Sequence, residues 1–172
     1  MKIVSIKKDL LNCYKKIDSE VLDKHGRPCL LILRLKYKGK KRMFAIPFRS
    51  NIPSNVPKIH YFALPPRPST KKNHRHGLHY IKMMPITKMF LERYRLDSPA
   101  SILYNSILER NKKRIIEECQ KYLDLYEKGQ WPSYCTSIDK LIVALEEMEH
   151  NYSDKCSKIS SVLFRNTIVY IK

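Results

Sequence analysis

Hydrophobic and polar residues alternate with a short period in the first part of this chain, as expected of strands. Apolar runs of this kind predict strands over residues 2–6, 29–37, 42–48, 59–64 and 78–82. A helix is predicted over residues 8–17, because Leu10, Leu11 and Tyr14 follow the helical period. The region up to residue 96 is therefore predicted to be rich in β structure.

Two of these runs form a β-hairpin, which is the clearest local signal. The run Cys29–Tyr37 meets the basic turn Lys38-Gly39-Lys40-Lys41, after which the alternation resumes as far as Phe48. The second strand is expected to end at Phe48, so that Arg49 and Ser50 follow where the backbone leaves the sheet. Prolines and basic residues crowd the segment 65–77, which is expected to be an exposed basic loop.

The helical period dominates the second part of the chain. Apolar residues recur at helical spacing over 100–128, where the polar stretch 109–114 indicates a bend or an exposed face. Gly129 indicates a stop, and Thr136 or Ser137 is expected to cap a further helix that carries Ile138. The chain is then predicted to return as a strand within residues 160–171.

Strands followed by helices predict an α+β fold. We expect a small, strongly bent antiparallel sheet or open barrel, with long helices packed against it. A single domain is expected to span residues 1–172, with a basic β-rich part at 1–96, a helical part at 97–150 and a C-terminal strand at 160–171. Neither GxGxxG nor GxxxxGK occurs, so the sequence offers nothing to a Rossmann or P-loop nucleotide site.

Charge is distributed unevenly along the chain. The net charge is +18, and residues 1–96 supply all of it, with 23 lysines and arginines against five acidic residues. Solubility alone does not require one sign of charge in half a protein. The bland interpretation is a basic but idle face; the functional one is a site for a polyanion, most often nucleic acid. Five cysteines without a CxxC pair argue against a disulfide framework or a zinc ribbon and favour the cytoplasm.

Arg49 and Ser50, at the expected strand end, are the first candidates for chemistry. A guanidinium and a hydroxyl can both donate hydrogen bonds to a phosphate; the alternative is that Ser50 only caps a turn. His60 is a reserve general base, because an ordinary histidine has a pKa of ~6.5. Tyr104, at the start of the long helical region, is either a core residue or part of a site.

Histidines cluster at His74, His76 and His79, but lysines and arginines surround them and acidic residues are scarce. We therefore expect no metal site and no cofactor there, and favour an RNA-facing loop. If such a protein cleaves nucleic acid, the simplest chemistry is RNA cleavage without a metal. The RNA 2′-hydroxyl is then the nucleophile, and the protein supplies proton transfer and cations.

Three short blocks resemble the ToxN/AbiQ group of type III toxin–antitoxin endoribonucleases, which includes TenpN and CptN. The first block is Phe44-Ala45-Ile46-Pro47-Phe48-Arg49-Ser50, similar to a family strand that ends in a proline and an active-site serine. The second is Gly77-Leu78-His79-Tyr80-Ile81-Lys82-Met83-Met84-Pro85-Ile86, and the third is Ile102-Leu103-Tyr104. The resemblance covers most of residues 1–125 and ends at about residue 128.

This resemblance implies a bent barrel like that of the Kid and MazF toxins, with added helices. It implies metal-independent cleavage that leaves 2′,3′-cyclic phosphate and 5′-hydroxyl ends. It also implies inhibition by a repeated small RNA pseudoknot, which the toxin cuts from its precursor and with which it closes into a ring-like assembly. Such systems often act in abortive infection against phage.

The resemblance also assigns site residues. Ser50 matches the family serine and Tyr104 the family tyrosine, while Arg49 stands where some members have threonine. Ile52 stands where some members have a lysine, so that Lys58 or His60 is left as the proton-transfer partner. Contacts to RNA are expected from a basic set, namely Arg27, Lys36, Lys38, Lys40, Lys41, Arg42, Lys71, Lys72, Arg75, His76 and Lys82.

Two alternatives stay open at this point. One is a MazF-like RNase that is held by a protein antitoxin and would bind an acidic partner. The other is a basic RNA-binding protein without catalysis, which would bind RNA with a steep salt dependence and leave it intact.

Overall fold

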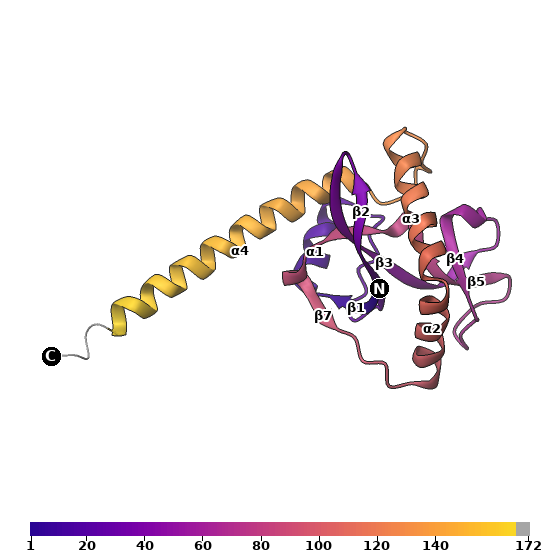
Figure 1. The fold of residues 1–172 in the computed structure, drawn as a ribbon, viewed down its shortest axis with the longest axis horizontal. Coiled ribbons are helices and arrows are strands. Elements are labelled where there is room, and N and C mark those ends of the chain that lie inside the picture. Colours follow the sequence, from indigo (N-terminus) through magenta and orange to yellow (C-terminus); the bar gives the residue numbers. More distant parts are fainter. Residues whose placement is uncertain (168–172) are drawn as a thin grey trace.

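The computed structural model describes residues 1–167, and the side chains of all of these except Leu33 and 153–167. Strands and short 3-10 helices alternate in the first part of the chain, and three long α-helices follow (Figure 1). The elements in chain order are β1 (Lys2–Ile6), α1 (Lys8–Ile17), β2 (Cys29–Tyr37), β3 (Lys40–Pro53), η1 (Lys58–His60), β4 (Tyr61–Leu64), β5 (His74–His79), η2 (Tyr80–Lys82), β6 (Met84–Ile86), η3 (Lys88–Phe90), β7 (Leu91–Arg93), α2 (Pro99–Arg110), α3 (Lys112–Glu127) and α4 (Ile138–Thr167).

All seven strands within residues 1–167 belong to one antiparallel sheet. Its order is β4-β5-β3-β2-β1-β7, and β6 pairs with β3 beside this path. β4 and β7 are not paired with each other, so the sheet is open and does not close into a barrel. The expected α+β class and the antiparallel sheet are confirmed.

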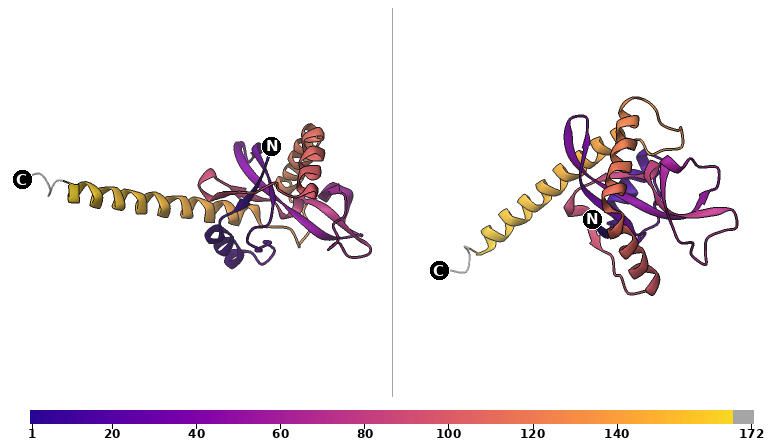
Figure 2. Two further views of the ribbon diagram at one scale, coloured as in Figure 1. Left: turned by 90° about the horizontal axis from the view of Figure 1, so that it is seen from below. Right: turned by 45° about the vertical axis from the view of Figure 1, so that its right-hand side comes forward.

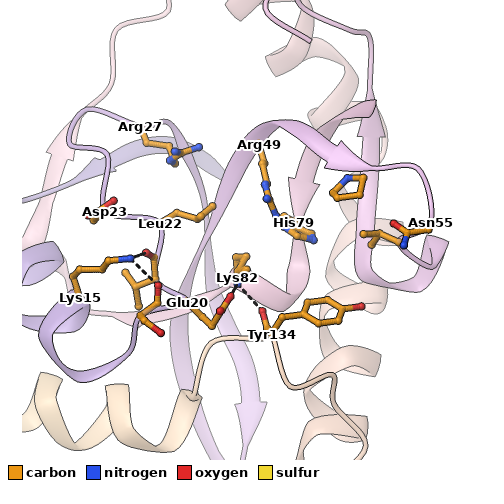
Figure 3. Close-up of a pocket in the computed structure, with 14 residues that line it drawn as sticks. Lys15, Glu20, Leu22, Asp23, Arg27, Arg49, Asn55, His79, Lys82 and Tyr134 are labelled. Carbon is orange, nitrogen blue, oxygen red and sulfur yellow. Dashed lines mark hydrogen bonds and ion pairs between the residues drawn. The ribbon is translucent and has the colours of Figure 1, made fainter. Parts of the chain in front are cut away.

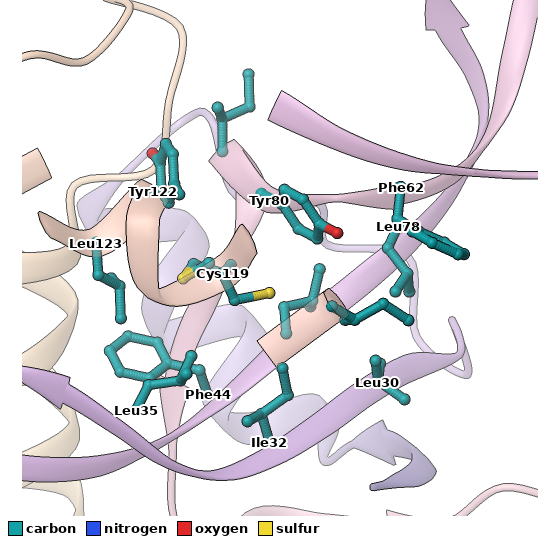
Figure 4. Packing of buried hydrophobic residues seen from close by; sticks show 14 of the residues in the cluster. Leu30, Ile32, Leu35, Phe44, Phe62, Leu78, Tyr80, Cys119, Tyr122 and Leu123 are labelled. Carbon is teal, nitrogen blue, oxygen red and sulfur yellow. The ribbon is translucent and has the colours of Figure 1, made fainter. Parts of the chain in front are cut away.

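Both faces of the sheet are covered, because β2 and β3 send alternate side chains into two clusters. Leu30, Ile32 and Phe44 belong to the cluster under α2 and α3, which also contains Tyr80 and Tyr122 (Figure 4). The neighbouring positions belong to a second cluster, which α1 and the first part of α4 cover; they are Cys29, Leu31 and Ala45. Burial on both faces explains why the β2 segment reads as a nearly continuous apolar run.

The first part of α4 packs on the body of the protein, and the remainder runs away from it (Figure 2). Leu141, Ala144 and Leu145 are buried, and the Tyr152 ring meets Phe90 at 5.9 Å between centroids. The predicted C-terminal strand is therefore wrong over residues 160–167, which are helical, while 168–171 lie outside the described residues. No proline or glycine lies between Pro132 and the last described residue of α4, so the helix contains no strong helix breaker up to residue 167. None of the helices within residues 1–167 is both long and apolar enough to span a membrane.

Three other predicted boundaries move. β3 does not end at Phe48 but continues to Pro53, because β5 provides it with a second partner. The basic loop is correspondingly shorter and ends at Asn73. His60 lies in the 3-10 helix η1, not on a strand. The long helical region breaks at Asn111, within the polar stretch that indicated a bend.

Candidate functional site

A β-bulge in β3 organises the predicted site. Arg49 pairs with Gly77 and Ile52 pairs with Arg75, so Ser50 and Asn51 together oppose the single residue His76. Such a bulge re-aims side chains and is common beside active sites. Arg49 comes just before the bulge, and Ser50 is the first of the two bulged residues.

Arg49 lines a pocket of about 470 Å³ (Figure 3). Its walls come from the end of α1, the loop between α1 and β2, the bulged part of β3, β5 and η2, and the loop before α4. The charged and imidazole groups that line it are Lys15, Glu20, Asp23, Arg27, Arg49, His79 and Lys82. Cations outnumber carboxylates in this set.

Two of these cations are arginines without an ion pair. Arg27 donates from Nη1 to the carbonyl oxygen of Phe48 at 3.0 Å, and its buried Nε has no hydrogen-bond partner among the described residues. Burial lowers the pKa of Arg27, and the charge of Arg49 lowers it further. Among the residues whose side chains the structure describes, no carboxylate forms an ion pair with either guanidinium. Two close, unpaired guanidiniums in one pocket are suited to bind an anion such as phosphate.

His79 joins this pair, and the sequence reasoning did not single it out as a site residue. Its Nδ1 lies 3.4 Å from Nη1 of Arg49. Burial, Arg49 and Lys82, in that order, lower the pKa of His79 to about 3, so the ring is neutral at pH 7. A guanidinium has no acceptor, so Nδ1 must accept and the proton must lie on Nε2. This buried Nε2 has no hydrogen-bond partner in the part of the chain that the structure describes. The sequence did contain a signal for His79, because it lies two residues after Gly77, and such residues share a face of a strand. This signal points to Arg49 only when Gly77 is known to pair with Arg49.

Lys82 has a different environment from the exposed contact that the sequence predicted. It is 3% exposed, its Nζ pairs with Glu20 Oε2, and it also donates to the carbonyl oxygen of Tyr134 at 2.6 Å. A buried ammonium needs such partners, because burying an unpaired charge is costly. Lys82 therefore joins three distant segments in the wall of the pocket (Figure 3).

Tyr104 and His76 pack together, with 4.9 Å between ring centroids. Both are buried, and both bond the carbonyl oxygen of Pro65, His76 from Nδ1 at 2.9 Å and Tyr104 from Oη at 3.3 Å. The guanidinium carbon of Arg67 lies 5.2 Å from the centre of the Tyr104 ring. The bulge register places Ser50 and Asn51 opposite His76, the strand residue whose ring packs on Tyr104.

The two candidates for proton transfer also separate. Lys58 is exposed at the start of η1. His60 is half-buried, and burial lowers its pKa. Its Nδ1 has no hydrogen-bond partner among the side chains and backbone groups that the structure describes. His60 also contributes to the lowered pKa of His79, which places it near the basic pocket. No group of three or more His, Cys, Asp or Glu side chains in the described region is arranged to hold a metal ion.

Solved structures with this fold come from bacterial antiviral and toxin–antitoxin systems. One belongs to an antiviral system regulated by a processed non-coding RNA: TM-score 0.67, 18% identity, 86% of this chain and 98% of that chain. Another belongs to a type III system whose toxin is selectively inhibited by a non-coding RNA pseudoknot. Its TM-score is 0.65 at 19% sequence identity, and the match covers 86% of this chain and 97% of that chain. A third is AbiQ, a lactococcal anti-phage endoribonuclease of a type III system. Its TM-score is 0.64 at 14% sequence identity, and the match covers 87% of this chain and 98% of that chain.

The chain has the fold of type III toxins. The resemblance found in the sequence motifs is thus confirmed at the level of structure. No protein-family model matches the sequence, and no curated protein matches it either.

On this toxin fold the predicted RNA contacts fall into three groups. Lys36, Lys40, Lys41, Lys71, Lys72 and Arg75 are exposed. Two hairpin-tip residues are paired with acidic residues of α4: Lys38 Nζ lies 2.7 Å from Asp139, and Arg42 lies 3.2 Å from Glu146. Arg27, Lys82 and His76 are half-buried or buried, so they do not belong to an exposed basic surface.

Proposed function

We propose that this protein is the endoribonuclease toxin of a type III toxin–antitoxin system. The observation that carries the proposal is the pair of unpaired guanidiniums, Arg27 and Arg49, beside the bulge that presents Ser50. The fold adds support, because the anti-phage endoribonuclease AbiQ shares it.

The proposed reaction uses the RNA's own 2′-hydroxyl as the nucleophile and requires no metal. The 2′-oxygen forms a bond to phosphorus while the bond from phosphorus to the 5′-oxygen breaks. The 2′-proton passes to a base, and the leaving 5′-oxygen receives a proton. The products are a 2′,3′-cyclic phosphate and a 5′-hydroxyl. Groups that stabilise the extra negative charge on phosphorus lower the barrier.

Arg49 and Arg27 are proposed to hold the scissile phosphate and to stabilise this charge. Ser50, on the bulge, is proposed to position or polarise the phosphate. Tyr104 and either His60 or Lys58 are proposed to transfer protons. Between the latter two, the half-buried His60 suits a general base better, because its lowered pKa leaves the imidazole neutral at pH 7.

The regulation and setting belong to the same proposal. A repeated small RNA pseudoknot would act as antitoxin, cut from its precursor by the toxin and bound by the exposed basic residues, in a ring-like toxin–RNA assembly. The protein would act in the cytoplasm, as one domain over residues 1–172, in abortive infection. We further propose that the open sheet is related to the Kid and MazF core; the antiparallel β2–β3 hairpin supports this.

The test incubates purified protein with RNA in excess EDTA and determines the chemistry of new ends. Ends with 2′,3′-cyclic phosphate that Ser50→Ala and Arg49→Gln each abolish, and Arg93→Gln retains, are the expected result. Arg93 is the matched control, since it lies on β7, at the opposite edge of the sheet from β4.

The other results have distinct meanings. RNA that is bound but left intact would make the protein a non-catalytic binder. A MazF-like toxin would be favoured if the protein cleaves RNA and if it co-purifies from the native host with a protein inhibitor but without RNA. Cleavage that EDTA abolishes would remove the metal-independent mechanism.

A further inference from the structure

A second pocket lies directly beside the basic one. Its volume is about 450 Å³, within the ~300–1,000 Å³ range typical of ligand sites. The two pockets share Ser19 and Glu20 as lining residues, so the loop that follows α1 is the wall between them. A polynucleotide with a phosphate in the first pocket therefore has the second pocket as a neighbour.

Trp131 presents a flat ring in this second pocket. Its ring stacks on Tyr126, with 4.6 Å between centroids and 20° between planes. The residue is nevertheless 45% exposed. Tyr126 covers one face of the indole, so this exposure belongs to the other face and the edges. An exposed indole face is the kind of platform on which an unpaired nucleobase stacks.

The loop that carries Trp131 is held firmly at both ends. Gly129, at φ +77°, and Gln130 donate their N–H groups to carbonyls of the last turn of α3. On the other side Thr136 donates from its hydroxyl to the carbonyl oxygen of Met83 at 2.7 Å. Tyr126 is itself fixed, because its hydroxyl accepts the N–H of Ile138 at 3.0 Å. The platform is therefore preorganised, which lowers the entropy cost of binding a ligand.

The charges around Trp131 differ from those of the basic pocket. Asp18, Glu20 and Asp139 line the second pocket, against the single cation Lys140. Carboxylates repel a phosphate, but they accept hydrogen bonds from the N–H groups at the edge of a base. Asp139 accepts from Tyr37 and Lys38 through Oδ1, which leaves Oδ2 without a hydrogen bond to any described residue.

We propose that this pocket is a subsite for an unpaired purine base, which stacks on Trp131 while a neighbouring phosphate of the same RNA strand occupies the basic pocket. Purines have the larger stacking surface, and guanine offers two adjacent N–H donors to a carboxylate. The inference rests on the proposed function in one respect, namely that the ligand is RNA. Beyond the proposed function, the inference gives a location for the base next to the reacting phosphate.

The chain offers a direct probe, because Trp131 is its single tryptophan. The experiment titrates the wild-type protein with a purine-containing 2′-O-methyl oligoribonucleotide, which cannot be cleaved because its 2′-oxygen is methylated. Tryptophan emission and the anisotropy of a labelled copy are followed in parallel. We expect saturable quenching with the same midpoint as the anisotropy, and weaker quenching by an oligouridine of equal length.

Variants test the contribution to affinity. Trp131→Ala is expected to weaken binding of the purine oligonucleotide about tenfold or more, whereas Trp131→Phe keeps most of the affinity, as a stacking role requires. Tyr152→Ala is the control, because Tyr152 is also an exposed aromatic residue but packs on Phe90, near the middle of α4.

The outcomes separate this inference from the proposed function. The subsite would be overturned if the oligonucleotide binds tightly without changing the tryptophan emission and if Trp131→Ala binds it with wild-type affinity. The proposed RNA-binding toxin would stand in that case. That result would fit a platform for a protein partner instead. Equal quenching by oligouridine would overturn the purine assignment. No binding of RNA at all would overturn both proposals.

Discussion

Arg49 on β3 contacts His79 on β5, with Nη1 of the arginine 3.4 Å from Nδ1 of the imidazole. The contact keeps a neutral histidine next to a cation, in the pocket that we propose for the scissile phosphate. It also selects the tautomer, with the proton on Nε2. A bound phosphate would add negative charge here and so favour a charged imidazole.

The lowered pKa of His79 makes the stability of the protein depend on pH. The unfolded chain binds a proton on this side chain below pH 6.5, but the folded chain binds it only below about pH 3. Between these values the unfolded state holds more protons, so the free energy of unfolding falls as the pH falls. From pH 7.5 to pH 5 this one group should cost about 2 kcal/mol.

Urea unfolding of the wild type and of His79→Asn at both pH values measures this cost. Burial also lowers the pKa of His60 and of His76, so the variant should retain part of the pH dependence. The difference between the two proteins isolates His79. Parallel curves for both proteins would mean that His79 is protonated normally in the folded state.

The basic pocket should bind RNA through phosphate contacts. Arg27→Gln and Arg49→Gln are each expected to weaken RNA binding at low salt, and each should reduce the slope of log K against log salt by about 1. Fluorescence anisotropy with a 2′-O-methyl oligonucleotide at several salt concentrations gives both quantities. Arg93→Gln, on the edge strand β7, should leave the affinity nearly unchanged. Equal slopes for all three variants would show that the pocket does not hold a phosphate.

Removing the hydroxyl oxygen of Tyr104 can separate a structural role of this residue from a catalytic one. Its hydroxyl makes a long 3.3 Å hydrogen bond to Pro65, whose carbonyl still accepts from His76 in the absence of that hydroxyl. Tyr104→Phe should therefore cost at most about 1 kcal/mol of stability. If the hydroxyl transfers a proton, the same variant should lose about 100-fold or more in single-turnover cleavage rate. A Tyr104→Phe protein that cleaves at the wild-type rate would reduce Tyr104 to a packing residue.

Gly77 is required by the close approach of β4 to β5. A Cβ at this position would overlap the carbonyl oxygen of Phe62 and lie 2.9 Å from its carbonyl carbon. Both atoms are backbone, so Gly77→Ala must push the strands apart, and we expect a loss of about 3 kcal/mol or failure to fold. The control is Gly26→Ala, at φ +72° in open space, which should cost only about 1 kcal/mol. Thermal unfolding of the two variants compares them directly, and similar losses would contradict this explanation.

Much of the local structure follows from patterns within a few residues. β1, α1 and β2 agree with the predicted segments, β3 forms the predicted hairpin with β2 but extends beyond its predicted end, and the helical break falls at Asn111 within the predicted polar stretch. Local periodicity reports which face of an element is buried, and glycine or polar residues report where it stops. The concentration of positive charge in residues 1–96 is likewise a property of composition, and it already indicated a polyanion.

The site depends on information that such patterns do not carry. Arg49 and His79 are 30 positions apart in the chain, and the pairing of β3 with β5 brings their side chains to 3.4 Å from each other. Lys82 looks like one more exposed lysine of a basic region, but its burial follows from Glu20, 62 positions away. Contacts between distant segments depend on strand register and packing, which are properties of the whole folded chain. Residue types and the basic character are therefore visible locally, whereas the pocket that assembles Arg27, Arg49, His79 and Lys82 exists only once the sheet has formed.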